Sequence, residues 1–422
     1  MKQFIPGVLR NKFVGNSGIY FLGAVFQKGL NFLLVPVYMR LISPAEYGVL
    51  DLCNTVIVLL CILFSMGLPN LWQGDFFRLD NAERERFFQK LVSTYLFVIS
   101  PIALLIFLVL QVYQLEIFGA KASLWSAIIV CSTAYLTLFQ TLFKNSLELG
   151  SKPLIFITNA LVIGVLSSGV NILCVGILNF GYIGALCGTL LGLLITLIHA
   201  WYIFKRFKFS WKWLVDWAES KHLIGQALPF IAVPLAYWAL ISVDRWFILY
   251  FLAEDELGYY AVSGKFSAIF DPLIIAPVMS AYTPYVYKRF ADGKYGQSLF
   301  KVTLLVILGF ALASAFVFFA AGFVVTEEYR EALNIIPIQI LGYSFYLLTM
   351  IANCALVYFK QSKAALYNML PVIAVNLILN FLLIPRYGIF GAATAFLFSQ
   401  ALWTTITFWR RARVIKNAVM GI

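Results

Sequence analysis

Long apolar stretches, each wide enough to cross a lipid bilayer, follow one another along almost the whole chain. A membrane-crossing helix needs about 20 mostly apolar residues, and about twelve stretches of that kind can be marked. They cover residues 17–40, 48–68, 90–112, 124–146, 155–178, 182–204, 224–250, 259–282, 302–322, 333–358, 366–385 and 389–409. Backbone groups in lipid must find their hydrogen bonds within the crossing segment. The sequence therefore predicts an all-α integral membrane protein with about 12 transmembrane helices.

The second half of the chain repeats short patterns of the first half, in the same order and at a nearly constant offset. The matched pairs are Leu41–Gly48 with Phe251–Gly258, Ser151–Lys152 with Ser362–Lys363, and Gly181–Ala185 with Gly388–Ala392. Each half holds six of the apolar stretches, so each half returns the chain to the side on which it began. The halves are predicted to be two parallel six-helix repeats, related by an axis along the membrane normal, an arrangement found in transporters.

Lysine and arginine are distributed unevenly over the segments between the stretches. In the connecting segments and at the ends of the stretches, almost all of these residues lie on the side that holds both termini. The exceptions are Arg40, Lys121, Arg330 and Arg386. The positive-inside rule places the basic side, and with it both termini, in the cytoplasm. The net charge of +12 is attributed to this topology and to attraction for anionic lipid headgroups, and no nucleic-acid partner is expected.

The segment 205–223 is basic and aromatic and separates the two repeats. It is interpreted as a cytoplasmic linker at the level of the headgroups, between an N-terminal six-helix lobe (1–204) and a C-terminal six-helix lobe (224–422). The loops on the opposite side are short, which argues against a membrane enzyme that needs a sizeable external loop. The six cysteines lack metal-binding spacing and the chain has only two histidines, so neither a metal nor another cofactor is expected.

Helix breakers and small residues lie within several stretches. The prolines are Pro36, Pro229, Pro234, Pro272 and Pro277. Proline removes an intrahelical hydrogen bond, so kinks are expected there. Gly184, Gly188 and Gly192 recur at intervals of four residues and are interpreted as a packing surface that lets helices approach closely.

Charged residues inside the stretches are the main indication of function. Away from the ends of the stretches they are Lys28, Asp51, Asp244, Arg245, Lys265 and Asp271, and all lie in the first two stretches of either repeat. An ionised group at the bilayer centre costs roughly 2.5–3.5 kcal/mol on insertion scales, so these side chains must face protein or water. Because they occupy equivalent helices of both repeats, we expect those helices to line one central cavity.

Two interpretations of these charges remain open. In the first, Lys28, Arg245 and Lys265 bind a phosphate-bearing group within the membrane, with arginine gripping it bidentately and lysine acting as a point charge. In the second, the cations form internal ion pairs with Asp51, Asp244 and Asp271. These aspartates are also candidates for carrying a coupling proton or sodium ion. Lys265 and Asp271 lie on different helix faces, so one contacts a neighbouring helix while the other faces the lumen.

Two further residues are candidates for substrate binding. Arg40 ends the first stretch and adds a cation there. Trp238 shares a helix face with Arg245 and is a candidate for stacking on a sugar ring. The neighbouring aromatic residues Trp246, Tyr259 and Tyr260 are interpreted chiefly as interfacial anchors.

Three segments give the chain a family resemblance. They are Tyr38–Gly48 (YMRLISPAEYG), Ser242–Trp246 (SVDRW) leading to Glu256–Ala261 (ELGYYA), and Asn380–Ala393 (NFLLIPRYGIFGAA). On these residues and the number of stretches, the chain resembles polysaccharide-biosynthesis flippases of the O-antigen (Wzx) type, in the multidrug/oligosaccharidyl-lipid/polysaccharide transporter superfamily. The resemblance covers essentially the whole chain. It implies two six-helix lobes in a V shape, with one cationic cavity that is lined by the first two helices of both repeats.

The resemblance also implies an activity. It is the transfer of an undecaprenyl-diphosphate-linked oligosaccharide from the cytoplasmic to the periplasmic leaflet of the bacterial inner membrane, for O-antigen, capsule or exopolysaccharide synthesis. Membrane lipids and a polysaccharide polymerase are the implied partners. A cation-coupled exporter of drugs or small molecules, from the same superfamily, is the main alternative. A membrane-embedded glycan polymerase or ligase is the second alternative.

Overall fold

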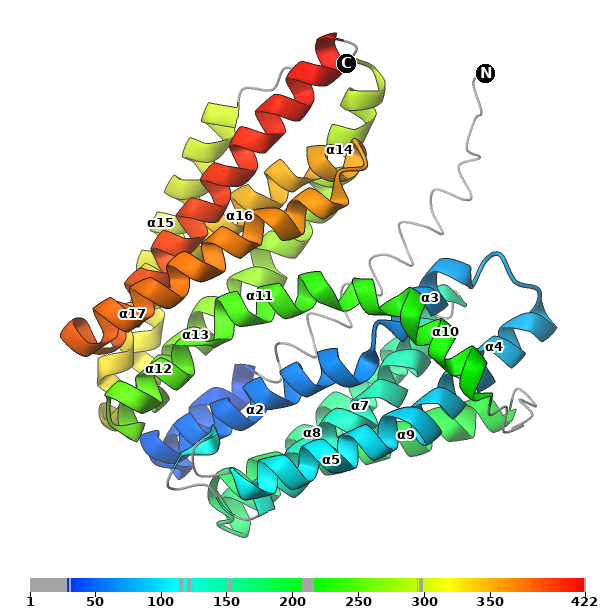
Figure 1. Ribbon diagram of the computed structural model, residues 1–422. Coiled ribbons are helices and arrows are strands. Elements are labelled where there is room, and N and C mark those ends of the chain that lie inside the picture. Colours follow the sequence, from blue (N-terminus) through cyan, green and yellow to red (C-terminus); the bar gives the residue numbers. More distant parts are fainter. Residues whose placement is uncertain are drawn as a thin grey trace. The chain divides into compact units, whose positions relative to one another are not determined.

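A computed structural model defines the fold, and every regular element in its described part is a helix (Figure 1). The described residues are 29, 32–113, 117–119, 123, 125–150, 153–206, 216–293, 295 and 299–420. Within them, nine helices are long and apolar enough to cross a membrane, and two shorter apolar helices, Phe32–Leu41 and Gly164–Ile177, accompany them. The last long helix, Leu366–Met420, is two helices joined at Gly388, whose backbone is not helical (φ 58, ψ −142).

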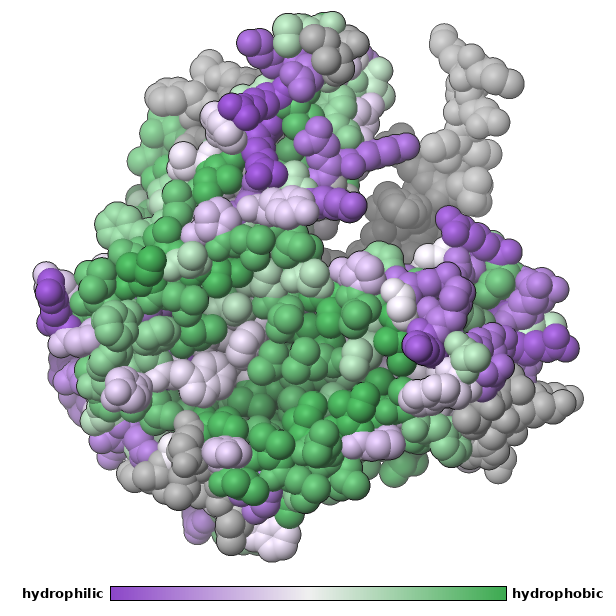
Figure 2. Space-filling view, viewed as in Figure 1, coloured by the Kyte–Doolittle hydropathy of each residue, from purple (hydrophilic) through white to green (hydrophobic). Residues whose placement is uncertain are grey.

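The described helices follow the predicted apolar stretches in order, and the first stretch is described mainly from Phe32 onward. The prediction of an all-α multi-pass membrane protein is therefore confirmed. Hydrophobic residues cover much of the visible surface over the helices, whereas hydrophilic residues gather near helix ends (Figure 2). This is the distribution that lipid imposes, because apolar side chains face hydrocarbon and charges stay near water.

The chain divides into two compact units. The first consists of Met1–Val37 and Cys53–Ile231. Beyond the end of α2 (Pro44–Ser65), its described elements are α3 (Leu68–Asp75), α4 (Asn81–Thr94), η1 (Tyr95–Ile99), α5 (Ser100–Val112), α7 (Trp125–Leu149), α8 (Pro153–Ile172), η2 (Leu173–Ile177), α9 (Gly181–Arg206), α10 (Trp217–Ala227) and η3 (Leu228–Ile231).

The glycines of α9 bring it into close contact with the preceding helix. A Cβ atom on Gly184 would lie 2.9 Å from the carbonyl oxygen of Cys174, and one on Gly188 would lie 2.2 Å from Oδ1 of Asn171. A Cβ atom on Gly192 would meet the Ser167 side chain. The predicted close packing through small residues is therefore confirmed.

The helix α10 packs within the first unit. It begins after Asp216, whose carboxylate accepts hydrogen bonds from the amides of Ala218 and Glu219 and so caps the helix. Glu219 also pairs with Lys90 of α4. Residues 207–215, nine of the 19 residues of the expected linker, lie outside the described residues.

The second unit consists of Tyr38–Leu52 and Ala232–Ile422. Besides the start of α2, its elements are α11 (Ala232–Ser242), α12 (Asp244–Phe251), α13 (Glu254–Ala268), η4 (Asp271–Ile275), α14 (Ala276–Ala291), α15 (Leu299–Val324), η5 (Glu327–Ile335), α16 (Ile336–Tyr358) and α17 (Ser362–Met420). Kinks are predicted at five prolines, and two of these prolines lie in irregular turns. Pro229 lies in the 3₁₀ turn η3 and Pro272 in the π-helical turn η4.

Repeat-related residues touch one another in the second unit. Gly48 in α2 and Gly258 in α13 are equivalent in the two repeats, and their helices cross in backbone contact. A Cβ atom on Gly258 would lie 1.9 Å from the carbonyl oxygen of Pro44, and one on Gly48 would lie 3.1 Å from the amide nitrogen of Gly258. Glycine is thus required at this crossing because any side chain would push the backbones apart.

The loop ahead of α2 is also held by η5. The hydroxyl of the buried Tyr329 donates a hydrogen bond of 2.8 Å to the carbonyl oxygen of Ile42. The Thr326 hydroxyl donates to the carbonyl oxygen of Met39 at 3.3 Å. The ring of Tyr329 meets that of Tyr47 edge to face at 5.9 Å. These contacts explain why Tyr38–Leu52 belongs to the second unit.

The crossing gives a stability prediction. Gly258→Ala should destabilise the protein by about 1–3 kcal/mol through overpacking, because the new methyl group meets rigid backbone. Gly264→Ala in the same helix is the matched control, since a Cβ atom there has no neighbour within 4 Å. Melting temperatures of the two purified variants in detergent provide the measurement. Equal melting temperatures would show that the crossing tolerates a side chain.

Candidate functional site

A cluster of charged side chains lies among three helices of the second unit. Asp51 belongs to α2, Asp244 and Arg245 open α12, and Lys265 lies in the last turn of α13. The single turn residue Val243 separates α11 from α12, so α12 begins at the cluster. A carboxylate such as that of Asp244 is favourable in the first turn of a helix, near the positive end of its dipole.

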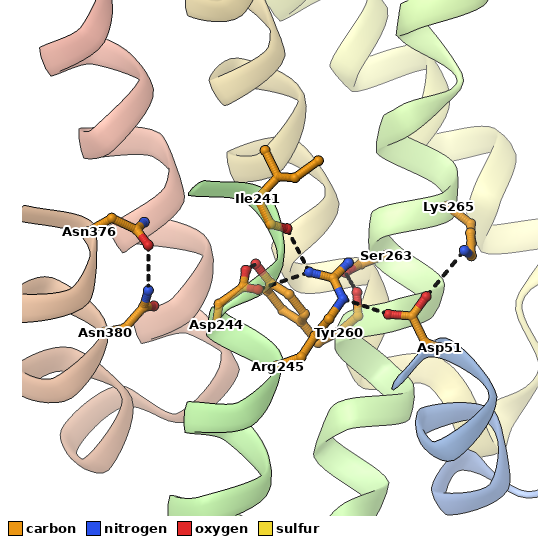
Figure 3. Close-up of polar contacts among 9 residues, drawn as sticks. All are labelled: Asp51, Ile241, Asp244, Arg245, Tyr260, Ser263, Lys265, Asn376 and Asn380. Atoms are coloured by element: carbon orange, nitrogen blue, oxygen red, sulfur yellow. Dashed lines mark hydrogen bonds and ion pairs between the residues drawn. The ribbon is translucent and has the colours of Figure 1, made fainter. Parts of the chain in front are cut away.

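Arg245 is the centre of the cluster (Figure 3). Its Nε donates to Oδ2 of Asp51 at 2.8 Å, and its Nη1 donates to Oδ1 of Asp244 at 2.8 Å. Nη1 also donates to the carbonyl oxygen of Ile241 at 2.7 Å, one helical turn earlier. With 17% of its side chain exposed, the guanidinium is held in place by two carboxylates and one backbone carbonyl.

Asp51 bridges the two cations of the second repeat. While Oδ2 accepts from Arg245, Oδ1 lies 3.2 Å from Nζ of Lys265. Only 4% of the Asp51 side chain is exposed, compared with 42% of the Lys265 side chain. The side chain of Lys265 is therefore the most accessible of the three.

Asp244 has a second partner in Tyr260. The Tyr260 hydroxyl donates a hydrogen bond to Oδ2 of Asp244, and both side chains are buried. The guanidinium of Arg245 also lies 5.8 Å from the centroid of the Tyr260 ring. The expectation that Tyr260 is an interfacial anchor is wrong, because the buried carboxylate needs a donor that the tyrosine supplies.

The energetics explain this dense pairing. Burying a charge in a low-dielectric interior is expensive unless it is paired and hydrogen-bonded. Asp51 and Asp244 are both buried, and between them they receive bonds from Arg245, Lys265 and Tyr260. Asp51 and Asp244 therefore form internal ion pairs with the cations, as the second interpretation of the sequence expected. Substrate binding by Arg245 and Lys265 stays a prediction.

Asp271 is separate from this cluster. In the described part of the chain, the ion-pair partners of Lys265 and Arg245 are Asp51 and Asp244, whereas Asp271 opens η4. Pairing of Asp271 with the third cation, Lys28, stays a prediction because Lys28 lies outside the described residues. Lys265 points to a neighbouring helix, the first of the two orientations expected for it.

The remaining predicted substrate-binding residues lie elsewhere. Lys28 is outside the described residues. Arg40 is exposed at the end of the first described helix. Trp238 is partly buried in α11, and its ring centroid lies 5.7 Å from that of Trp246. The structure thus brings Arg245 and Lys265 together through a shared carboxylate, and roles for Arg40 and Trp238 remain predictions.

A pair of asparagines on α17 was not expected from the sequence. Nδ2 of Asn380 donates to Oδ1 of Asn376 at 3.0 Å (Figure 3). Nδ2 of Asn376 in turn donates to the Ser399 hydroxyl at 3.0 Å. Their spacing of four residues within an apolar stretch was the available signal. Among the described residues, no group of three or more histidine, cysteine, aspartate or glutamate side chains could hold a metal ion.

The helices and the buried charge cluster define the class of the protein: a multi-pass membrane protein with paired charged side chains inside its helix bundle. Residues 13–290 match the family of polysaccharide biosynthesis proteins. This match covers more than half of the chain, which therefore belongs to that family. No curated protein matches the sequence.

Solved structures share the fold across nearly the whole chain. One is the lipid II flippase MurJ in an inward closed conformation, with a TM-score of 0.72 and 14% identity, covering 96% of this chain and 91% of that one. Another is an inward-facing multidrug resistance MATE transporter of the MOP superfamily, with a TM-score of 0.74 and 12% identity, covering 92% and 96%. A mutant of the Vibrio cholerae MATE transporter VcmN matches with a TM-score of 0.55 and 14% identity, covering 99% and 98%. The protein has the fold of these transporters.

The cluster gives a second stability prediction. Arg245→Gln removes the shared partner of two buried carboxylates and should destabilise the protein by about 3–5 kcal/mol. Lys265→Gln should have a much smaller effect, because 42% of the Lys265 side chain is exposed and Asp51 keeps Arg245 as a partner. Melting temperatures of the purified variants compare the two.

A combined variant tests the physical reason. Adding Asp51→Asn and Asp244→Asn to Arg245→Gln removes the uncompensated charges and should recover part of the lost stability. Equal effects of Arg245→Gln and Lys265→Gln, without recovery in the combined variant, would contradict the central role of Arg245.

Proposed function

We propose that this protein is a flippase that moves an undecaprenyl-diphosphate-linked oligosaccharide from the cytoplasmic to the periplasmic leaflet of the bacterial inner membrane. The observation that carries this proposal is the family match over residues 13–290 to polysaccharide biosynthesis proteins. A fold shared with a lipid II flippase agrees with it. The transported unit is proposed to serve O-antigen, capsule or exopolysaccharide synthesis, with a polysaccharide polymerase acting on it afterwards.

The charge cluster supplies the chemistry that such a substrate needs. A diphosphate is anionic, and in lipid it requires cationic and hydrogen-bonding partners. We assign the first contact to Lys265, whose side chain is the most exposed of the cluster. Arg245 is a second ligand, with a planar fork that suits phosphate oxygens. The prenyl chain stays in lipid, and aromatic residues such as Trp238 offer faces for sugar rings.

The proposed orientation follows from the basic segments. Both termini and the segment between the repeats are placed in the cytoplasm, where lysine and arginine accumulate. In this orientation Arg40 lies at the periplasmic end of its helix. The protein is proposed to act by binding and conformational change, without chemical conversion of the substrate.

The first functional test is the sidedness of the lipid-linked oligosaccharide in cells that lack the protein. Repeat units should accumulate in the cytoplasmic leaflet, and the amount of surface glycan should fall. The measurement is labelling of the lipid-linked sugar by a membrane-impermeant lectin in intact spheroplasts. Expression of the wild-type chain should restore labelling.

Lys265→Gln should restore at most about a tenth of the labelling, because the loss of a desolvated charge contact costs roughly 1.4 kcal/mol or more. Lys221→Gln is the matched control, since Lys221 is an exposed lysine of α10. Normal sidedness in the deletion strain would contradict the flippase proposal. Such a result together with increased sensitivity to toxic cations would favour an exporter, the other activity known for this fold among the MATE structures.

A further inference from the structure

The segment Tyr38–Leu52 comes from the first repeat but belongs to the second unit. Two groups of contacts hold it there. One is uncharged: the crossing of Gly48 with α13 and the hydrogen bond from Tyr329 to the Ile42 carbonyl. The other is ionic: the bonds of Asp51 to Arg245 and Lys265. Another anion can compete only with the ionic contacts, because the uncharged contacts involve no cation.

The cations that hold Asp51 are also the cations of the proposed substrate site. When Asp51 leaves, Arg245 keeps Asp244 as a partner at 2.8 Å. Among the described residues, by contrast, Asp51 is the only ion-pair partner of Lys265. An anion that reaches Lys265 must therefore compete with Asp51, whereas Asp244 can remain in place.

We propose that Asp51 is an internal counter-anion that the diphosphate of the substrate displaces, and that this displacement releases Tyr38–Leu52 from the second unit. The inference rests on the proposed function and names a positioning residue for it. Asp51 does not bind the substrate: it occupies the cations until the substrate arrives.

The exchange is physically reasonable because the two anions differ in charge and in acceptors. A diphosphate carries more negative charge and more acceptor oxygens than a carboxylate, so it satisfies the lysine and the arginine fork better. A ligand shifts a conformational equilibrium only by its difference in affinity for the two states. Here the difference arises because the cations are available only when Asp51 is displaced.

The direction in which Asp51→Asn changes the affinity for the substrate distinguishes a counter-anion from a residue that only holds the cations in position. Asp51→Asn removes the competing charge, so undecaprenyl diphosphate should bind the purified variant in nanodiscs about tenfold more tightly than the wild type. If Asp51 merely holds the cations in position, the same substitution should weaken binding. The matched control is Asp75→Asn, which removes a partly exposed carboxylate paired with Arg78 in the first unit and should leave the affinity unchanged.

A second measurement uses the wild-type cluster, so it does not depend on how well Asp51→Asn folds. Spin labels are placed on Leu41→Cys and Glu328→Cys, two exposed positions on either side of the Tyr329 contact, after the six native cysteines are changed to serine. Undecaprenyl diphosphate should increase the population with the longer distance at least several-fold in pulsed electron paramagnetic resonance. Undecaprenol, which lacks the diphosphate, should leave the distances unchanged.

The outcomes distinguish this inference from the proposed function. If the wild type binds undecaprenyl diphosphate no better than undecaprenol, the proposed function fails and the inference with it. If the wild type binds it, but Asp51→Asn binds equally or more weakly, the displacement of Asp51 is overturned and the function stands. Unchanged label distances at saturating diphosphate would overturn the release of Tyr38–Leu52.

Discussion

The pairing of buried carboxylates with a small number of cations is the constraint on which the described site depends. Asp51 and Asp244 lie among apolar helices, where an ionised group without a partner would cost several kcal/mol. Arg245 satisfies both and also caps the Ile241 carbonyl, so its position fixes α2 and α12 relative to each other. Lys265 of α13 places a second positive charge beside Asp51. The contact between repeats in the second unit is therefore partly electrostatic.

The glycine crossing gives this electrostatic contact its geometry. Because Gly48 and Gly258 let the backbones of α2 and α13 meet, Asp51 comes within ion-pair distance of Lys265. A side chain at either glycine would separate the helices, and the ion pair would lengthen. Gly48 and Asp51 lie about one turn apart in α2. The close helix crossing and the ion pair are therefore linked.

Sequence reasoning identified the membrane helices, the repeat and the residues that carry charge, but it left their partners open. Asp51, Arg245 and Lys265 stood out because each interrupts an apolar stretch. Helical periodicity gave their faces within one helix, yet it could not say which helix each face meets. This is why Asp271 was expected beside the cations and Tyr260 at the interface, whereas Asp271 pairs with neither Arg245 nor Lys265 and Tyr260 is buried against Asp244.

The sequence by itself determined the all-helical membrane architecture, since lipid leaves an apolar backbone few alternatives to helix. It also determined that a small set of charges must lie inside the bundle. Only the tertiary structure decided that one carboxylate, Asp51, bridges the two cations and that Tyr38–Leu52 packs with the opposite repeat. Those features depend on contacts between residues 194 to 287 positions apart. Such contacts follow from how helices cross, which local periodicity does not encode.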